Sequence, residues 1–181
     1  MFKEIITTLI TSLVSIIGFV VTYRSLMKSF KNELRKSRDS LALEKMSTVP
    51  YDILELFDDL MESSCFKKES QKAKENQKTF KKLMNTIYSY GSINAIKIFA
   101  LMQKENYDRF NQGRNLDDIY RISSMYVLLA TQIKYDVTGI IVSPNLWFEM
   151  RMTDYSTNIE NYKRANNKIV DELRLNRGFK I

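Results

Sequence analysis

The chain has 181 residues, of which 44% are hydrophobic and 27% are charged, and its formal net charge is +7. These proportions are those of an ordinary folded protein and exclude collagen-like, disulfide-stapled and disordered chains. Histidine is absent, cysteine occurs once, and the chain has five glycines and two prolines. This composition argues against His-based active sites and phosphate-binding glycine loops, so we expect a non-enzymatic protein with no catalytic residue, metal or cofactor.

The N-terminal segment carries no charge from Ile5 to Tyr23, a run of 19 residues. As a helix this run is roughly 28 Å long, close to the thickness of a hydrocarbon core. We predict one transmembrane helix at 5–23, after a short extracytoplasmic N-terminus at 1–4. A cleaved signal peptide is less favoured because the segment lacks a basic start and a small-residue cleavage site. A core helix that is apolar all round would need protein on every side.

Charge on the two sides of the predicted span is unequal. Lys3 alone precedes it, whereas a basic cluster follows within the range that orients spans: Arg24, Lys28, Lys31, Arg35, Lys36 and Arg38. The positive-inside rule then puts the N-terminus outside and the rest of the chain in the cytoplasm, at the cell membrane. We predict a basic juxtamembrane helix and linker at 24–49, since each basic residue near an anionic leaflet contributes about 1 kcal/mol of attraction.

Small residues recur along one face of the predicted span, at Thr7, Thr11, Ser15 and Gly18. Small residues at such spacing let two helix backbones approach closely. This face is our hypothesis for a transmembrane association face that makes a homo-oligomer.

Two oppositely charged helices should follow. A hydroxyl and proline at Thr48 and Pro50 favour a helix over 50–62, whose net charge is −5. A Lys-rich helix should then end at Gly91, with a net charge of +5 over 67–82. The acidic residues Asp52, Glu55, Asp59 and Glu62 share a face, but di-metal bundles also need histidines. We therefore interpret the face as solvated, with the two helices pairing weakly along their edges.

The remaining elements are also helical. Ser92 can cap a helix whose inward residues are Ile93, Ile96, Phe99 and Met102. A polar loop is expected over 106–115. Further helices follow at about 116–136 (with Ile119 buried), 143–155 and 156–176. The first is ended by Gly139, the second is started by Ser143 and Pro144, and the last is stopped by Gly178. The predicted fold is all-α: one N-terminal transmembrane helix followed by a cytosolic bundle of about five to six helices at 50–181.

One junction is the best candidate for a ligand site outside the membrane. Asp136 is expected to cap the turn at Thr138 and Gly139, Trp147 to wedge between helices behind it, and Asp154 to begin the last helix. Asp and Thr at helix ends usually satisfy backbone groups. A buried structural junction is therefore favoured over a ligand site made by Asp136, Trp147 and Asp154.

Three functions fit these features. The favoured one is a single-pass, membrane-anchored interaction, sensing or effector module that acts through an unknown protein partner at the inner face of a membrane. Lys-, Asn- and Ile-rich usage suggests that the membrane is bacterial. The alternatives are a membrane-tethered nucleic-acid-binding protein and an oligomerising, pore-forming effector. Nucleic acid is not favoured because the basic segment at 24–46, seven basic against three acidic residues, accounts for +4 of the +7 charge.

Overall fold

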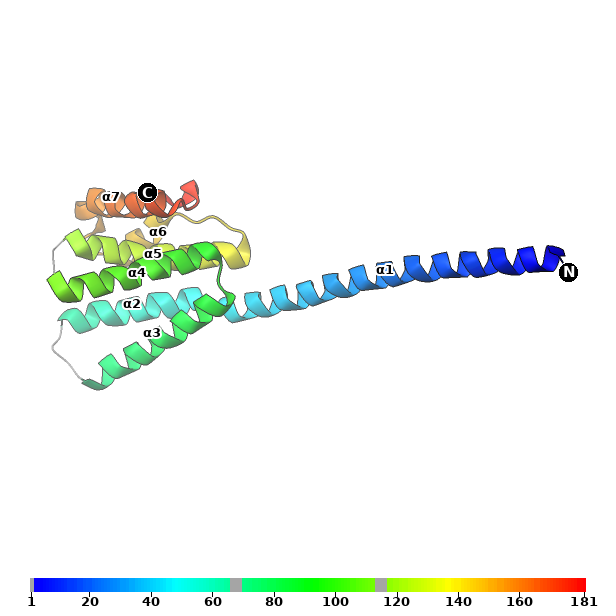
Figure 1. The fold of residues 1–181 in the computed structure, drawn as a ribbon. Coiled ribbons are helices and arrows are strands. Elements are labelled where there is room, and N and C mark those ends of the chain that lie inside the picture. Colours follow the sequence, from blue (N-terminus) through cyan, green and yellow to red (C-terminus); the bar gives the residue numbers. More distant parts are fainter. Residues whose placement is uncertain (1, 66–69, 113–116) are drawn as a thin grey trace. The chain divides into compact units, whose positions relative to one another are not determined.

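The computed structural model describes residues 2–65, 70–112 and 117–181, without the side chains of 4–13, 63–65, 70, 71, 73, 109–112, 117 and 118. In these residues the chain forms α-helices and one short 3₁₀ helix, and no strand. The elements are α1 (Phe2–Met46), α2 (Val49–Cys65), α3 (Ser70–Tyr90), α4 (Ile93–Gln112), α5 (Asp117–Thr138), α6 (Pro144–Arg151), α7 (Tyr155–Leu173) and η1 (Arg177–Phe179). The predicted all-α fold is confirmed, with α2–α7 supplying six bundle helices (Figure 1).

The chain divides into two compact units, Met1–Leu41 and Ala42–Ile181. The first unit is most of α1, a helix of 45 residues. The second unit holds the hydrophobic core and begins with the last turn of α1, where Met46 is 4% exposed.

The predicted transmembrane helix at 5–23 is not supported. Across the described residues, no helix combines the length and the apolar run that a membrane crossing requires. Beyond Tyr23, helix α1 continues into the charged residues Arg24, Lys28 and Lys31. The apolar part with described side chains, 14–23, is roughly 15 Å long at 1.5 Å per residue. The side chains of 4–13, which make up the rest of the prediction, lie outside the description.

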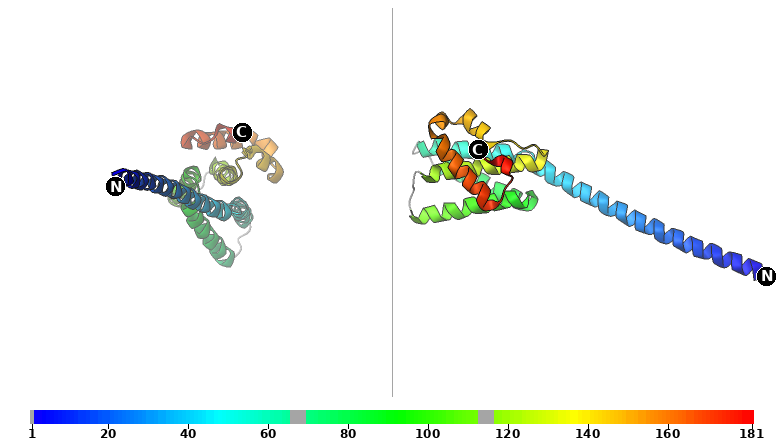
Figure 2. Two further views of the ribbon diagram at one scale, coloured as in Figure 1. Left: turned by 90° about the vertical axis from the view of Figure 1, so that its right-hand side faces the viewer. Right: turned by 90° about the horizontal axis from the view of Figure 1, so that it is seen from above.

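The bundle is built around α5. This helix contacts α2, α4, α6 and α7, and α3 covers α2 and α4 (Figures 1 and 2). Every residue of α5 from Ser123 to Ala130 is buried. A helix buried on all sides needs neighbours on all sides, and the four contacting helices supply them. The core cluster then extends to Ile53 and Phe57 of α2 and to Ile169 of α7.

Helix ends follow the predicted capping chemistry at three places. The Ser92 hydroxyl accepts a hydrogen bond from the Ala95 amide at 3.2 Å, which caps α4. Ser143 accepts from the Asn145 amide at 3.3 Å, directly before Pro144 at the start of α6. Gly139 ends α5 with φ +71°, a left-handed conformation that suits glycine.

Several predicted boundaries were wrong. The loop expected over 106–115 is largely helix, because α4 continues to Gln112 and contains no glycine or proline that would end it earlier. The helix expected to reach 155 ends at Arg151. The last helix ends at Leu173 rather than near Gly178, because Arg174 adopts φ 54° and closes it with bonds to the carbonyls of Asp171 and Val170.

Two predicted core residues also lie at the surface. Ile93 is 73% exposed and Ile119 is 47% exposed. Both stand in the first turn of their helix, where the helical pattern continues but neighbouring helices do not cover the side chain. Ile96 is half-buried, and Phe99 and Met102 are buried as predicted.

Candidate functional site: the apolar and basic surface of α1

The apolar part of α1 is exposed. Large apolar side chains from Val14 to Tyr23 are 42–72% exposed, namely Val14, Ile16, Ile17, Phe19, Val20, Val21 and Tyr23. At 100° per residue they cover about two thirds of the helix circumference. Ser15, Gly18 and Thr22 fill the remaining sector. Monomeric soluble proteins rarely leave an apolar surface of this extent exposed.

The predicted basic cluster follows on the same helix. Arg24, Lys28, Lys31, Arg35, Lys36 and Arg38 are all exposed. Asp39 lies 3.9 Å from Arg35 and 3.7 Å from Arg38. Such exposed pairs are weak, so the segment retains its positive field. In α1 an exposed apolar stretch is therefore followed directly by an exposed basic one.

The predicted association face lies only partly within the description. The side chains of Thr7 and Thr11 are outside it. Ser15 and Gly18 are exposed, and a Cβ at Gly18 would meet no atom within 4 Å. The face remains a prediction.

Asp136 bonds to other partners than predicted. Its carboxylate accepts hydrogen bonds from the Ser92 hydroxyl at 2.6 Å and from the Gln132 amide at 2.8 Å. It therefore joins the α3–α4 turn to the last turn of α5. The turn at Gly139 is held instead by Thr138, whose hydroxyl donates to the Lys134 carbonyl and accepts from the Ile140 amide.

Trp147 packs against an aromatic cluster formed by Phe148, Tyr155 and Tyr162, and Asp154 is close enough to act electrostatically on Tyr162. The Trp147 ring is 5.7 Å from its neighbour Phe148 on α6 and 5.7 Å from Phe57 of α2, so it packs α6 against α2. Asp154 accepts from the Asn158 amide at 3.0 Å. Asp136 therefore bonds to Ser92 and Gln132, whereas Trp147 and Asp154 lie beside the aromatic cluster.

Burial shapes the electrostatics of this aromatic cluster. Burial raises the pKa of Tyr162 to about 12, with the Asp154 carboxylate adding to the effect. The Tyr162 ring meets Tyr120 edge-on at 4.9 Å. The Tyr120 hydroxyl donates to Asn158 at 3.0 Å. The Asn158 side chain therefore hydrogen-bonds both the Asp154 carboxylate and the Tyr120 hydroxyl. These bonds give Asp154 and Tyr120 a structural role in the bundle.

The acidic side of α2 forms ion pairs with neighbouring helices. Asp59 lies 3.0 Å from the Lys72 ammonium of α3, and Asp58 lies 2.9 Å from the Arg151 guanidinium of α6. The hydrogen bond to Asp59 raises the pKa of Lys72. The predicted pairing of the two oppositely charged helices is present at Asp59. Within the described residues, no group of three acidic or cysteine side chains is placed to hold a metal.

Sequence reasoning missed a charged junction at Arg121. Its guanidinium bonds Glu105 of α4 at 2.6 Å and Glu172 of α7 at 2.8 Å. Burial disfavours the charged form, but the bonds to Glu172 and Glu105 outweigh it, so the pKa of Arg121 is raised. Nothing in the spacing of these residues along the chain predicts that three helices meet there.

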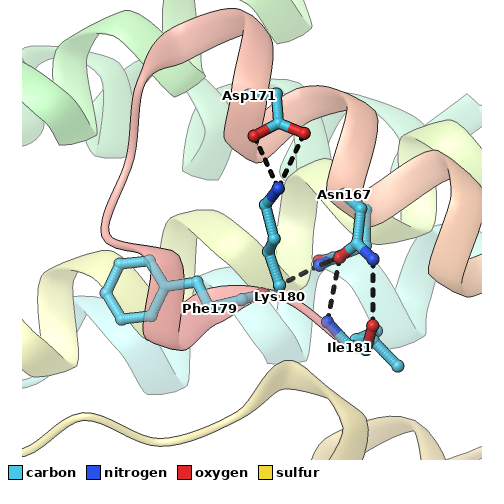
Figure 3. Close-up of polar contacts among 6 residues, drawn as sticks. Asn167, Asp171, Phe179, Lys180 and Ile181 are labelled. Atoms are coloured by element: carbon cyan, nitrogen blue, oxygen red, sulfur yellow. Dashed lines mark hydrogen bonds and ion pairs between the residues drawn. The ribbon is translucent and has the colours of Figure 1, made fainter.

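A pair of asparagines on α7 was also missed. The Asn166 amide donates to the Phe179 carbonyl at 2.8 Å, and the Asn167 side chain bonds both the amide and the carbonyl of Ile181 at 2.9 Å (Figure 3). Lys180 pairs with Asp171 at 2.7 Å. These bonds hold the C-terminal segment against α7. The adjacent Asn-Asn pair is a signal for backbone binding, which sequence inspection can notice but cannot place.

No protein-family model, curated protein or solved structure matches this chain.

Proposed function

We propose that this protein is a membrane-anchored helical module, with the apolar N-terminal part of α1 in a lipid bilayer and the bundle working as a protein-binding domain at the inner face. The observation that carries the proposal is the exposed apolar surface from Val14 to Tyr23. Transferring such side chains from water to an apolar medium stabilises by about 25 cal/mol per Å². Lipid supplies that medium on every side of the helix.

The basic segment supports the same orientation. Six basic residues from Arg24 to Arg38 follow the apolar part and are exposed. At an anionic leaflet each contributes about 1 kcal/mol. The charge order along α1 therefore favours apolar residues in lipid and basic residues at the headgroups.

A partner-binding role for the bundle is supported by its exposed apolar side chains. Leu146 and Met150 are 51% and 80% exposed and lie one turn apart on α6. Side chains at this spacing share a helix face, which is a common anchor arrangement in helix recognition. We propose this face as the part of the bundle that a protein partner covers.

Flotation with vesicles tests the anchoring. The full chain is expected to float with vesicles containing anionic lipid, whereas the I16E/F19E/V20E variant is expected to stay with the soluble fraction. The matched control is Y107E/L146E/M150E, which makes the same change in net charge at exposed apolar positions of the bundle and should float normally. Equal flotation of the two variants would exclude α1 as the lipid-binding element.

Purification of partners from cell membranes tests the binding role. The full chain is expected to retain proteins that L146E/M150E loses while still fractionating with membranes. If both chains retain the same proteins, the α6 face is not the partner site.

A further inference from the structure

A heptad pattern runs along the exposed part of α1. Large apolar residues recur at alternating spacings of four and three, at Ile16, Val20, Tyr23, Met27, Phe30, Leu34 and Leu41, with Ser37 as the polar exception. All seven apolar side chains are at least 40% exposed. Such a repeat over three to four heptads is typical of a coiled coil.

The pattern is clearest after Tyr23, where α1 becomes polar. Between Arg24 and Leu41 five large apolar residues occur, and Met27, Phe30, Leu34 and Leu41 occupy the seam. The fifth, Leu26, directly flanks it. The basic residues lie beside or opposite the seam, so the helix presents one apolar stripe.

We propose that α1 forms a parallel two-stranded coiled coil with α1 of a second copy of this chain. With Val20, Met27, Leu34 and Leu41 at the a positions, the e positions are Arg24, Lys31, Arg38 and Lys45, and the g positions are Phe19, Leu26, Glu33 and Ser40. In a parallel pair each g residue faces the e residue five places further along the partner helix.

The flanking charges select the parallel orientation. Glu33 then faces Arg38 of the second copy, an attractive pair, and the remaining e residues face Phe19, Leu26 and Ser40. An antiparallel pair would bring the four basic e positions against one another. Like charges in contact cost free energy, which disfavours that arrangement. Ser37 interrupts the apolar seam at one d position, which lowers the stability of the pair.

This seam is distinct from the predicted small-residue face. Ser15, Gly18 and Thr22 occupy c and f positions, on the side of α1 opposite to Val20 and Tyr23. The pairing also stands independently of membrane anchoring, since the seam from Met27 to Leu41 follows the apolar part of the helix.

Disulfide cross-linking of the full chain tests the proposal, with Cys65→Ser as background. Single cysteines at the seam (Val20→Cys, Met27→Cys or Leu34→Cys) should each give covalent dimers under mild oxidation, in detergent and in vesicles. Matched cysteines at Gly18, Lys28 and Asn32, on other faces, should not. Cross-links at positions as far apart as Val20 and Leu34 require a parallel, in-register pair, because an antiparallel pair brings like residues together only near its centre.

A second measurement, of the oligomeric state, uses glutamate substitutions within α1. Sedimentation of the full chain in detergent should give dimers, and F30E/L34E should give monomers while N32E remains dimeric. Cross-links at Gly18 in place of Val20 would assign the contact to the small-residue face and overturn the proposal. Monomeric wild-type protein without cross-links at Met27 or Leu34 would overturn it as well, whether or not the chain floats with vesicles.

Discussion

Two helices of this protein, α5 and the N-terminal part of α1, meet the same physical requirement in different ways. Both carry apolar residues over most of their circumference. In α5 every residue from Ser123 to Ala130 is buried by neighbouring helices, whereas every described residue of α1 from Val14 to Leu41 is exposed. An apolar helix surface in the sequence thus indicates that something must bury it. Only the structure shows whether other helices of the same chain do so.

Removing a large aromatic side chain from each region should give the largest contrast. Phe148 is 0% exposed and Phe19 is 72% exposed. Phe148→Ala is expected to lower the free energy of unfolding by about 3–5 kcal/mol, because it leaves a cavity in the core. Phe19→Ala should leave urea unfolding of the bundle unchanged. Equal effects in both variants would contradict the division into two units.

High pH should destabilise the bundle through its buried tyrosines. Burial raises the pKa of Tyr126 to about 12, above the unfolded value near 10. The folded state therefore binds more protons between these values, so the stability present below pH 10 is lost as the pH rises towards 12, by about 2 kcal/mol. Urea unfolding between pH 9 and pH 12 measures this. Tyr126→Phe should flatten the decline, and an unchanged slope would contradict burial of the hydroxyl.

Replacing Asn166, which holds the C-terminal segment, should lower the free energy of unfolding by less than Phe148→Ala does. Asn166→Ala removes the donor to the Phe179 carbonyl within the core. Leaving that carbonyl unpaired is expected to cost about 1–3 kcal/mol of stability. The control is Asn167→Ala, whose half-buried position lets water replace the lost bonds and predicts a smaller loss. A reversed order in thermal unfolding would place the main attachment at Ile181.

The smallest loss of stability is expected when Gly139 is replaced by alanine. Gly139 has φ +71° and open space around its α-carbon, so Gly139→Ala adds backbone strain without a steric clash. We expect a loss of about 1 kcal/mol. Gly18→Ala, inside α1, should not change bundle unfolding. A stabilised Gly139→Ala variant would show that the turn does not need the left-handed conformation.

Local chemistry explains what the sequence could predict. The caps at Ser92 and Ser143 and the stop at Gly139 depend on neighbouring residues, so they were predicted correctly. The boundary at Arg174 was missed because a left-handed arginine has no sequence signature. Ile93 and Ile119 were misplaced because periodicity cannot tell where neighbouring helices stop covering a face.

The candidate sites were predicted less completely for a related reason. The basic cluster of α1 is a contiguous stretch, and its exposure follows from its composition. The bond between Ser92 and Asp136 joins residues 44 positions apart, and Arg121 meets Glu172 across 51 positions. Such contacts are set by how helices stack, which the spacing of residues along the chain does not reveal.

The most direct test of lipid anchoring is depth-dependent quenching in vesicles. The full chain carries a fluorescent label at Val21→Cys, which lies outside the proposed seam of α1, in a Cys65→Ser background, and nitroxides on the lipid acyl chains act as quenchers. We predict strong quenching at position 21 and none at Tyr107→Cys, which lies on an exposed part of α4. Equal, weak quenching at both positions would contradict the account.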